Sequence, residues 1–198
     1  MPAGILMPDK SLQSVHRLLW QPGQALHPSW WAYWGMEDLM KIYPQLSLSG
    51  QRDIDGQIAL HRCLPDWRPG QLSERQAQLV QLQPKLPLLL TALGLVAMKC
   101  SGYVWLRRYR HELQQTFSEQ QLSQISVLMH EGSQPAEIQP ADLPTLSLNI
   151  GLKLISQTLL HEPVWQLLVF TLPRQSDFSI DAVLDNPLAA LSRLERFL

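Results

Sequence analysis

The sequence predicts a mainly α-helical protein, folded as a single irregular multi-helix domain around one central buried helix. The first observation is the run Leu88–Met98, which is nearly all apolar but too short to cross a bilayer. The second is the segment 105–117, whose apolar and basic residues fall on opposite sides of a helix drawn at about 100° per residue. The third is Ser118 with Gln121, a capping-box spacing that opens a further helix ending near Met129.

The N-terminal part of the chain is rich in tryptophan. Residues 1–14 are expected to be a flexible leader, and residues 15–198 the helical domain. Four of the seven tryptophans lie within residues 15–34, where Pro22 and Gly23 interrupt the first apolar run. Aromatic side chains this dense bury a large area, so some of them must belong to the core.

The segments that follow are expected to alternate between helix and loop. A helix should start at Pro28 or Ser29 and run to about Tyr43. The stretch Ser47–Gly56 reads as a loop, and Gln71–Gln83, which is rich in glutamine with spaced leucines, reads as a helix.

The segment 105–117 is expected to have one buried face and one basic face. We assign the apolar side chains to the buried face: Trp105, Leu106, Tyr109, Leu113 and Phe117. The basic side chains fall on the other face: Arg107, Arg108, Arg110 and His111.

The C-terminal third should contain two helices and one ambiguous segment. A polar loop with several prolines is expected over residues 130–145. Apolar residues at helical spacing follow it: Leu148, Leu152, Ile155 and Leu159. Residues 164–172 could form a short strand or a buried helix, and their periodicity does not choose between them. Asn186 followed by Pro187 is a good start for the last helix, in which Leu188, Leu191 and Leu194 share one face.

Composition limits the classes of function. Hydrophobic residues make up 45% of the 198, enough for a sizeable core, and charged residues only 17%. A net charge of −1 gives no attraction to nucleic acid. We expect a cytoplasmic protein with no membrane insertion, because no secretory signal and no run of 18 apolar residues is present. Cys63 and Cys100, which have no CxxC spacing, are expected to be reduced.

No catalytic, cofactor-binding or metal-binding motif stands out. The chain contains no glycine-rich phosphate loop, no GxSxG and no HExxH. The six histidines are scattered, and His61 with Cys63 would need further ligands to hold zinc. We therefore expect a protein that is not an enzyme and carries no cofactor. A deep polar pocket with convergent titratable groups would instead indicate an enzyme.

Two groups of residues are candidates for partner binding. Arg107, Arg108 and Arg110 could dock an acidic partner surface, or could be a solvated helix face whose stems cover apolar surface. Trp30 and Trp31 could both belong to the core. Neighbouring residues on a helix point about 100° apart, however, so one of the two indoles could lie near the surface and anchor an interface.

Three stretches together resemble the type III secretion sorting-platform adaptor family, of the SctK or YscK type. Residues 19–27, LWQPGQALH, are similar to the family's early aromatic-x-Pro followed by His, although Ala25 stands where the family has an aromatic residue. Residues 88–96 are similar to its central leucine-rich run containing LGLV, followed by paired basic residues. The third stretch is 152–173, a helix and then a Trp-containing segment ending in Leu-Pro.

The resemblance implies a non-enzymatic, mainly α-helical protein at the cytoplasmic face of the injectisome's inner-membrane ring. Such adaptors bridge the cytoplasmic domain of the ring protein (SctD type) and the pod protein (SctQ type). The same platform carries a stator (SctL type) and an ATPase (SctN type), which would be indirect partners. The alternative function is a type III secretion chaperone or regulator that holds one effector. Those proteins are usually small, acidic α/β dimers, whereas this chain is near neutral and reads as helical.

Overall fold

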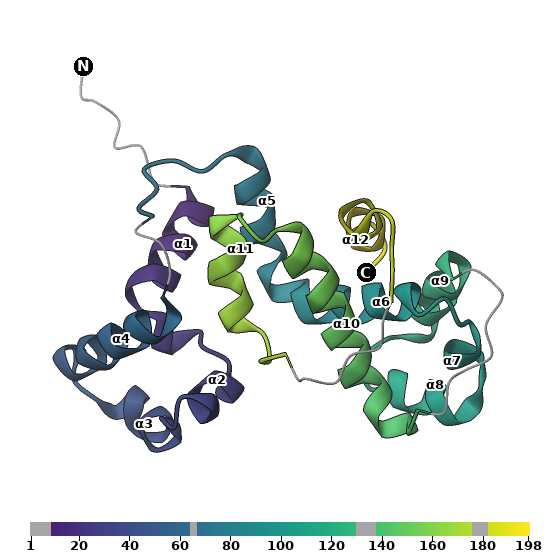
Figure 1. Ribbon diagram of the computed structural model, residues 1–198, viewed down its shortest axis with the longest axis horizontal. Helices are drawn as coiled ribbons and strands as arrows, with labels where there is room; N and C mark the ends of the chain where they lie inside the picture. The colour runs from purple at the N-terminus through teal and green to yellow at the C-terminus, as the bar shows by residue number, and fades with distance from the viewer. Residues whose placement is uncertain (1–8, 64–66, 130–137, 176–181) are drawn as a thin grey trace. The chain divides into compact units, whose positions relative to one another are not determined.

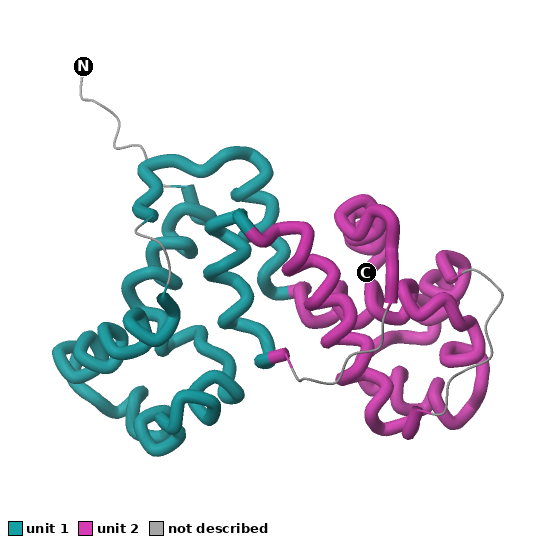
Figure 2. Tube along the Cα trace, viewed as in Figure 1, with its two compact units in different colours: residues 1–84, 161–174 teal, residues 85–160, 175–198 magenta. Residues whose placement is uncertain are grey.

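The computed structural model describes residues 9–63, 67–129, 138–175 and 182–198, and every regular element within these ranges is helical (Figure 1). The predicted mainly α fold is therefore confirmed. The chain divides into two compact units, where the sequence suggested one domain (Figure 2). Unit 1 comprises residues 1–84 and 161–174, and unit 2 comprises residues 85–160 and 175–198.

Unit 1 begins with a helix that starts earlier than expected. Asp9 accepts a hydrogen bond from the Ser11 N–H at 3.0 Å, so α1 starts at Lys10, inside the predicted leader. Residues 1–8 lie outside the described residues. The elements of unit 1 are α1 (Lys10–Trp20), η1 (Pro22–Gln24), α2 (Pro28–Tyr33), α3 (Glu37–Ile42), η2 (Tyr43–Gln45), α4 (Leu48–Arg62), α5 (Glu74–Leu82), α11 (Pro163–Leu168) and η5 (Val169–Thr171).

Two boundaries in unit 1 differ from the sequence prediction. The helix expected over 28–43 is divided into α2 and α3, because Gly35 adopts a left-handed φ of 68° between them. The loop expected over 47–56 is the first part of α4. Ser47 accepts a hydrogen bond from the Gly50 N–H at 3.3 Å, and Ile54 and Ile58 are buried one turn apart.

The ambiguous segment 164–172 is helical, so the strand alternative is wrong. Pro163 occupies the first turn of α11, and Glu162 accepts a hydrogen bond from the Val164 N–H at 3.4 Å. The buried residues of α11 are Val164, Trp165, Leu167 and Leu168, whose spacing fits a helix covered on most sides.

A buried polar cluster joins η1, η2 and α4 within unit 1. The Asp55 carboxylate accepts hydrogen bonds from the Gly23 N–H at 2.9 Å and from the Tyr43 hydroxyl at 3.0 Å. Arg62 donates to the Leu18 carbonyl at 2.9 Å. Burial raises the pKa of Asp55, while the Gly23 and Tyr43 hydrogen bonds and the Arg62 charge oppose that rise. Burial also lowers the pKa of Arg62 to about 10, against the effect of Asp55.

Unit 2 is arranged around the predicted buried helix, α6. Ten of its twelve residues are buried, as expected for a helix that is apolar on all sides. Of the loop expected over 130–145, residues 130–137 lie outside the described residues, and α10 begins earlier than expected, at Leu143. The elements of unit 2 are α6 (Leu86–Ala97), α7 (Gly102–Trp105), α8 (Arg107–Leu113), α9 (Glu119–Leu128), η4 (Pro140–Asp142), α10 (Leu143–Thr158) and α12 (Pro187–Glu195).

Helices α6 and α10 lie side by side, and two glycines let their backbones touch (Figure 1). A Cβ atom built on Gly94 of α6 would lie 1.8 Å from the Ser147 carbonyl oxygen of α10. A Cβ atom on Gly151 of α10 would lie 2.0 Å from the Leu90 carbonyl oxygen of α6. The buried hydroxyl of Ser147 donates back to the Leu143 carbonyl at 2.7 Å, so this close approach leaves it hydrogen-bonded. Any side chain at either glycine would therefore push the two helices apart.

The helical run Glu74–Ala97, in which η3 (Gln83–Lys85) joins α5 to α6, is long and apolar enough to cross a membrane. Its most apolar window has a mean hydropathy of 1.4, but 61% of that window is buried inside the protein. A core helix of a globular protein meets the same criteria, so length and composition alone are weak evidence for a membrane span here.

Replacing either contact glycine by alanine should strongly destabilise the protein. We expect Gly94→Ala and Gly151→Ala each to lower the free energy of unfolding by about 3 kcal/mol or more, because the new methyl group meets backbone rather than a flexible side chain. Urea unfolding followed by circular dichroism measures the change.

Gly56→Ala is the matched control for both variants. Gly56 lies inside α4, and a Cβ atom built there meets nothing within 4 Å beyond its chain neighbours and the local backbone of the helix. The control should be neutral or stabilising by up to about 1 kcal/mol, because alanine has the higher helix propensity. If Gly94→Ala and Gly151→Ala behaved like Gly56→Ala, the tight helix contact would be wrong.

Stability should also depend on pH through Asp55. Its folded-state pKa is raised above the ordinary value of 3.8, so the folded protein holds this proton more tightly than the unfolded chain does. The free energy of unfolding should then fall as pH rises from 3.8 through the raised folded pKa, and this fall should be missing in Asp55→Asn, which cannot ionise. Urea midpoints measured between about pH 4 and about pH 7 test this.

Asp53→Asn serves as the control for the pH series. Asp53 is an exposed residue of the same helix, so its removal should leave the wild-type pH profile in place. If the urea midpoints of the wild type and Asp55→Asn changed with pH in the same way, the raised pKa of Asp55 would be contradicted.

Candidate protein-docking surface

The segment 105–117 does not form the single two-faced helix that the sequence predicts. Leu106 is extended, with φ −72° and ψ 124°, and it separates α7 from α8. The break resets the direction in which side chains point. Trp105 is therefore 59% exposed and Leu106 is 43% exposed, which corrects their assignment to the buried face. The other three residues assigned to that face are buried as predicted: Tyr109, Leu113 and Phe117.

Arg107 and Arg108 are exposed at the start of α8. They border an open depression of about 780 Å³, whose other lining residues are Arg110, His111 and Gln114. The guanidinium of Arg108 lies over the ring of Tyr109, 4.7 Å from its centroid. Among the described residues, no carboxylate forms an ion pair with Arg107 or Arg108. Both side chains are exposed, so within the described structure a partner can reach them.

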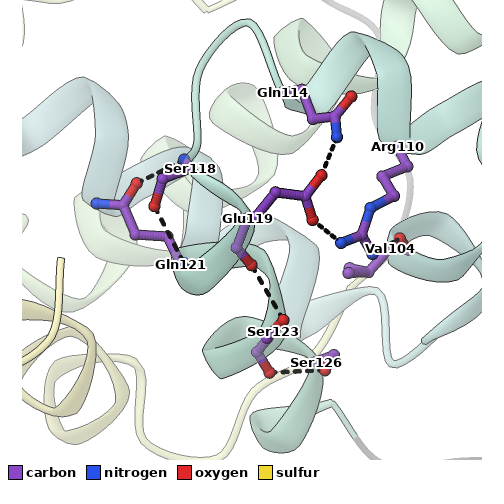
Figure 3. Close-up of polar contacts among 8 residues, drawn as sticks. All are labelled: Val104, Arg110, Gln114, Ser118, Glu119, Gln121, Ser123 and Ser126. Carbon is purple, nitrogen blue, oxygen red and sulfur yellow. Dashed lines mark hydrogen bonds and ion pairs between the residues drawn. The ribbon is translucent and has the colours of Figure 1, made fainter.

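Arg110 differs from its two neighbours because its guanidinium already has partners within unit 2 (Figure 3). It forms an ion pair with Glu119 and donates to the Val104 carbonyl at 3.3 Å. It also lies 5.8 Å from the ring centroid of Trp105. Its hydrogen bond to Glu119 lowers the pKa of that carboxyl, to which the Gln114 side chain also donates. Arg110 therefore links α8 to α7 and to the start of α9.

The predicted capping box at the start of α9 is confirmed. The Ser118 N–H donates to the Gln121 Oε1 at 2.9 Å, and the Gln121 N–H donates to the Ser118 Oγ at 3.2 Å (Figure 3). This cap makes Glu119 the first residue of the helix, next to Arg110. The capping box therefore determines where Glu119 lies in its ion pair with Arg110.

Trp31 and Trp30 have different surroundings in unit 1. Trp31 is only 1% exposed and lies in a core cluster with Tyr43, Ile54 and Ile58. Trp30 is half-buried. As the helical geometry predicts, the two indoles do not share one direction. Only Trp30 has surface that a partner could contact without a local rearrangement.

Trp30 also has a structural role, because α2 is fastened to the segment that follows α11. Its indole N–H donates to the Leu172 carbonyl at 3.0 Å, and its ring lies 4.8 Å from that of Phe170. The His27 N–H donates to the Phe170 carbonyl at 3.0 Å. The Arg174 N–H donates to the Ser29 Oγ at 2.8 Å. Residues more than 140 positions apart in the sequence are thereby held together.

Sequence reasoning missed an exposed aromatic residue beside this junction. Tyr33 is 58% exposed, and the guanidinium of Arg174 lies 3.9 Å from its ring centroid. The signal that could have found it is spacing, because Tyr33 follows the buried Trp31 by two residues and so points about 200° away.

Unit 2 has a second hollow, of about 530 Å³, between α6, α9 and α12. Its wall is mostly apolar, with Lys99, Asp185, Asn186 and Arg193 as polar groups. Across the described ranges, no group of three or more His, Cys, Asp or Glu side chains could hold a metal ion. Cys63 is exposed and Cys100 is buried.

Comparison with known proteins identifies one family. The family model described as "Type III secretion system subunit" matches residues 13–174. No curated protein and no solved structure matches the chain. The matched range covers most of unit 1 and the greater part of unit 2, well over half of the sequence. The chain therefore belongs to this family of type III secretion system subunits.

Proposed function

We propose that this chain is a non-enzymatic adaptor in the cytoplasmic sorting platform of the type III secretion injectisome. It would bridge the cytoplasmic domain of the inner-membrane ring protein (SctD type) and the pod protein (SctQ type), and through the platform reach the stator and ATPase (SctL and SctN types). The family match over residues 13–174 supports the part of the proposal that assigns the chain to a type III secretion system. The resemblance of residues 19–27, 88–96 and 152–173 to the SctK or YscK type supports the finer assignment.

On this proposal the protein works at the cytoplasmic face of the inner membrane, as a peripheral component. Each docking surface needs to bury only about 1,000 to 2,000 Å² in total to be specific. Several copies around a ring would add avidity, so no single contact needs to be tight. Such an adaptor requires two separate surfaces and no reaction chemistry.

The two units offer one candidate surface each. In unit 2 it is the exposed pair Arg107 and Arg108, whose guanidinium forks suit carboxylates on an acidic partner. In unit 1 it is the accessible part of Trp30 with the exposed ring of Tyr33, which lie in a T-shaped arrangement 6.2 Å apart. We assign the arginine pair to the ring protein.

Reversing the two free charges should weaken recruitment by the ring protein. We expect Arg107→Glu with Arg108→Glu to lower the affinity for the ring protein's cytoplasmic domain by about tenfold or more, because two attractive charges become repulsive. Arg110 is left unchanged, since a glutamate there would face Glu119 and disturb the fold. A pull-down with the purified cytoplasmic domain, followed by a titration, measures the effect.

The control reverses two exposed arginines of unit 1, Arg52 and Arg75. Both lie near helix N-termini, where glutamate is well tolerated, so this variant should bind the ring domain as the wild type does. Unchanged binding by the Arg107→Glu, Arg108→Glu variant would remove the docking assignment. Recovery of a lone effector in place of ring and pod proteins would favour a chaperone or regulator.

A further inference from the structure

Unit 2 exposes an apolar pair directly beside its two free arginines. Trp105 is 59% exposed and Leu106 is 43% exposed, and Arg107 and Arg108 follow them in the chain. A single exposed apolar side chain needs no explanation. Here an exposed tryptophan and an exposed leucine come directly before two exposed arginines in the chain. Tryptophan and arginine are among the residues that most often dominate binding energy at protein interfaces.

Arg110 connects the apolar pair to the basic depression. Its side chain lines the depression together with Arg107 and Arg108, and its guanidinium lies 5.8 Å from the ring centroid of Trp105. The ion pair with Glu119 and the hydrogen bond to the Val104 carbonyl fix that guanidinium (Figure 3). Trp105 therefore has a fixed cation beside its ring before any partner arrives, which lowers the entropy lost on binding.

The charge of the surface selects the partner's chemistry. The depression is lined by three arginines, one histidine and one glutamine. Glu119, the acid that Arg110 contacts, is also bound by Gln114. Neither of the two remaining guanidinium groups forms an ion pair within the described part of the chain, and a carboxylate is the ligand that suits their geometry.

We propose that Trp105, Leu106, Arg107 and Arg108 bind a short acidic segment of a partner protein. Carboxylates of that segment pair with the two arginines, and one of its apolar side chains packs against Trp105 and Leu106. This inference rests on the proposed adaptor function and adds the chemistry that the partner's segment must have. A protein segment is favoured over nucleic acid by the net charge of −1, and over a lipid surface by the small extent of the apolar pair.

The test uses the full-length protein and a synthetic probe. The probe is a fluorescein-labelled peptide of about twelve residues, with four glutamates around one leucine and serine elsewhere, a length that spans one such depression when extended. Two matched peptides replace either all glutamates by glutamine or the leucine by serine. Fluorescence anisotropy should detect binding of the first peptide, at least about tenfold weaker binding of the other two, and weakening of the first with added salt.

Variants of three of these four residues test where the peptide binds. Arg107→Gln with Arg108→Gln, and separately Trp105→Ala, should each weaken binding of the acidic peptide by about tenfold or more. All three side chains are exposed, so circular dichroism should show an unchanged fold. Arg52→Gln with Arg75→Gln removes the same charge from exposed sites of unit 1 and should bind as the wild type does.

Several outcomes would overturn the inference. Equal binding of the glutamine peptide would show that charge does not select the ligand, and full binding by Trp105→Ala would show that the indole is no anchor. Stronger binding to phosphatidylserine vesicles, lost in the same variants, would indicate a lipid surface instead.

One outcome separates this site from the adaptor function. If the peptide binds as expected while the ring and pod proteins fail to bind, the adaptor function is refuted and the acidic-segment site remains supported.

Discussion

The close contact between α6 and α10 is the constraint on which unit 2 depends. Gly94 and Gly151 each face a backbone carbonyl of the opposite helix, and the geometry is reciprocal: glycine of α6 against Ser147, glycine of α10 against Leu90. Helices that approach this closely exclude water along their length and place their apolar side chains against one another. Helices α8, α9 and α12 then contact this pair. The central helix is therefore a scaffold for the helices around it.

The candidate docking surface follows from local features placed on that scaffold. The extended backbone at Leu106 turns Trp105 and Leu106 outward, although their apolar character suggests burial. The capping box of α9 places Glu119 beside Arg110, and the two form an ion pair. Of the three arginines predicted to bind a partner, Arg110 is therefore already paired within unit 2. What remains exposed is a pair of arginines next to an indole. An exposed ion pair such as that of Arg110 adds little to stability, and its effect here is on side-chain position.

Much of the fold could be predicted because its signals are local. The apolar run of α6, the Ser118 capping box and the Asn186-Pro187 helix start all act within a few residues, and each appears in the structure. The Asn186 side chain accepts the Ala189 N–H at 3.0 Å. The beginning of α4 was missed because Gly50 and Gly56 weaken its helical pattern, while Ser47 and the buried isoleucines decide the outcome.

The remaining features depend on tertiary contacts that a sequence pattern does not carry. The division into two units requires residues 161–174 to return to the N-terminal helices, through bonds such as that from Trp30 to the Leu172 carbonyl. The burial of Asp55 and Arg62 likewise follows from partners far along the chain, namely Gly23 and Leu18. The basic face could be read from spacing alone, but which of its arginines is free could not, because Glu119 lies on a different helix.

An adaptor must hold two partners at once, and the most direct measurement is the mass of the complex formed in solution. The full-length protein would be mixed with the ring protein's cytoplasmic domain and the pod protein, and the species resolved by size-exclusion chromatography with light scattering. We expect a single species containing all three proteins, because the candidate surfaces lie on different units. Mutually exclusive binding of the two partners, or binding of neither, would contradict it.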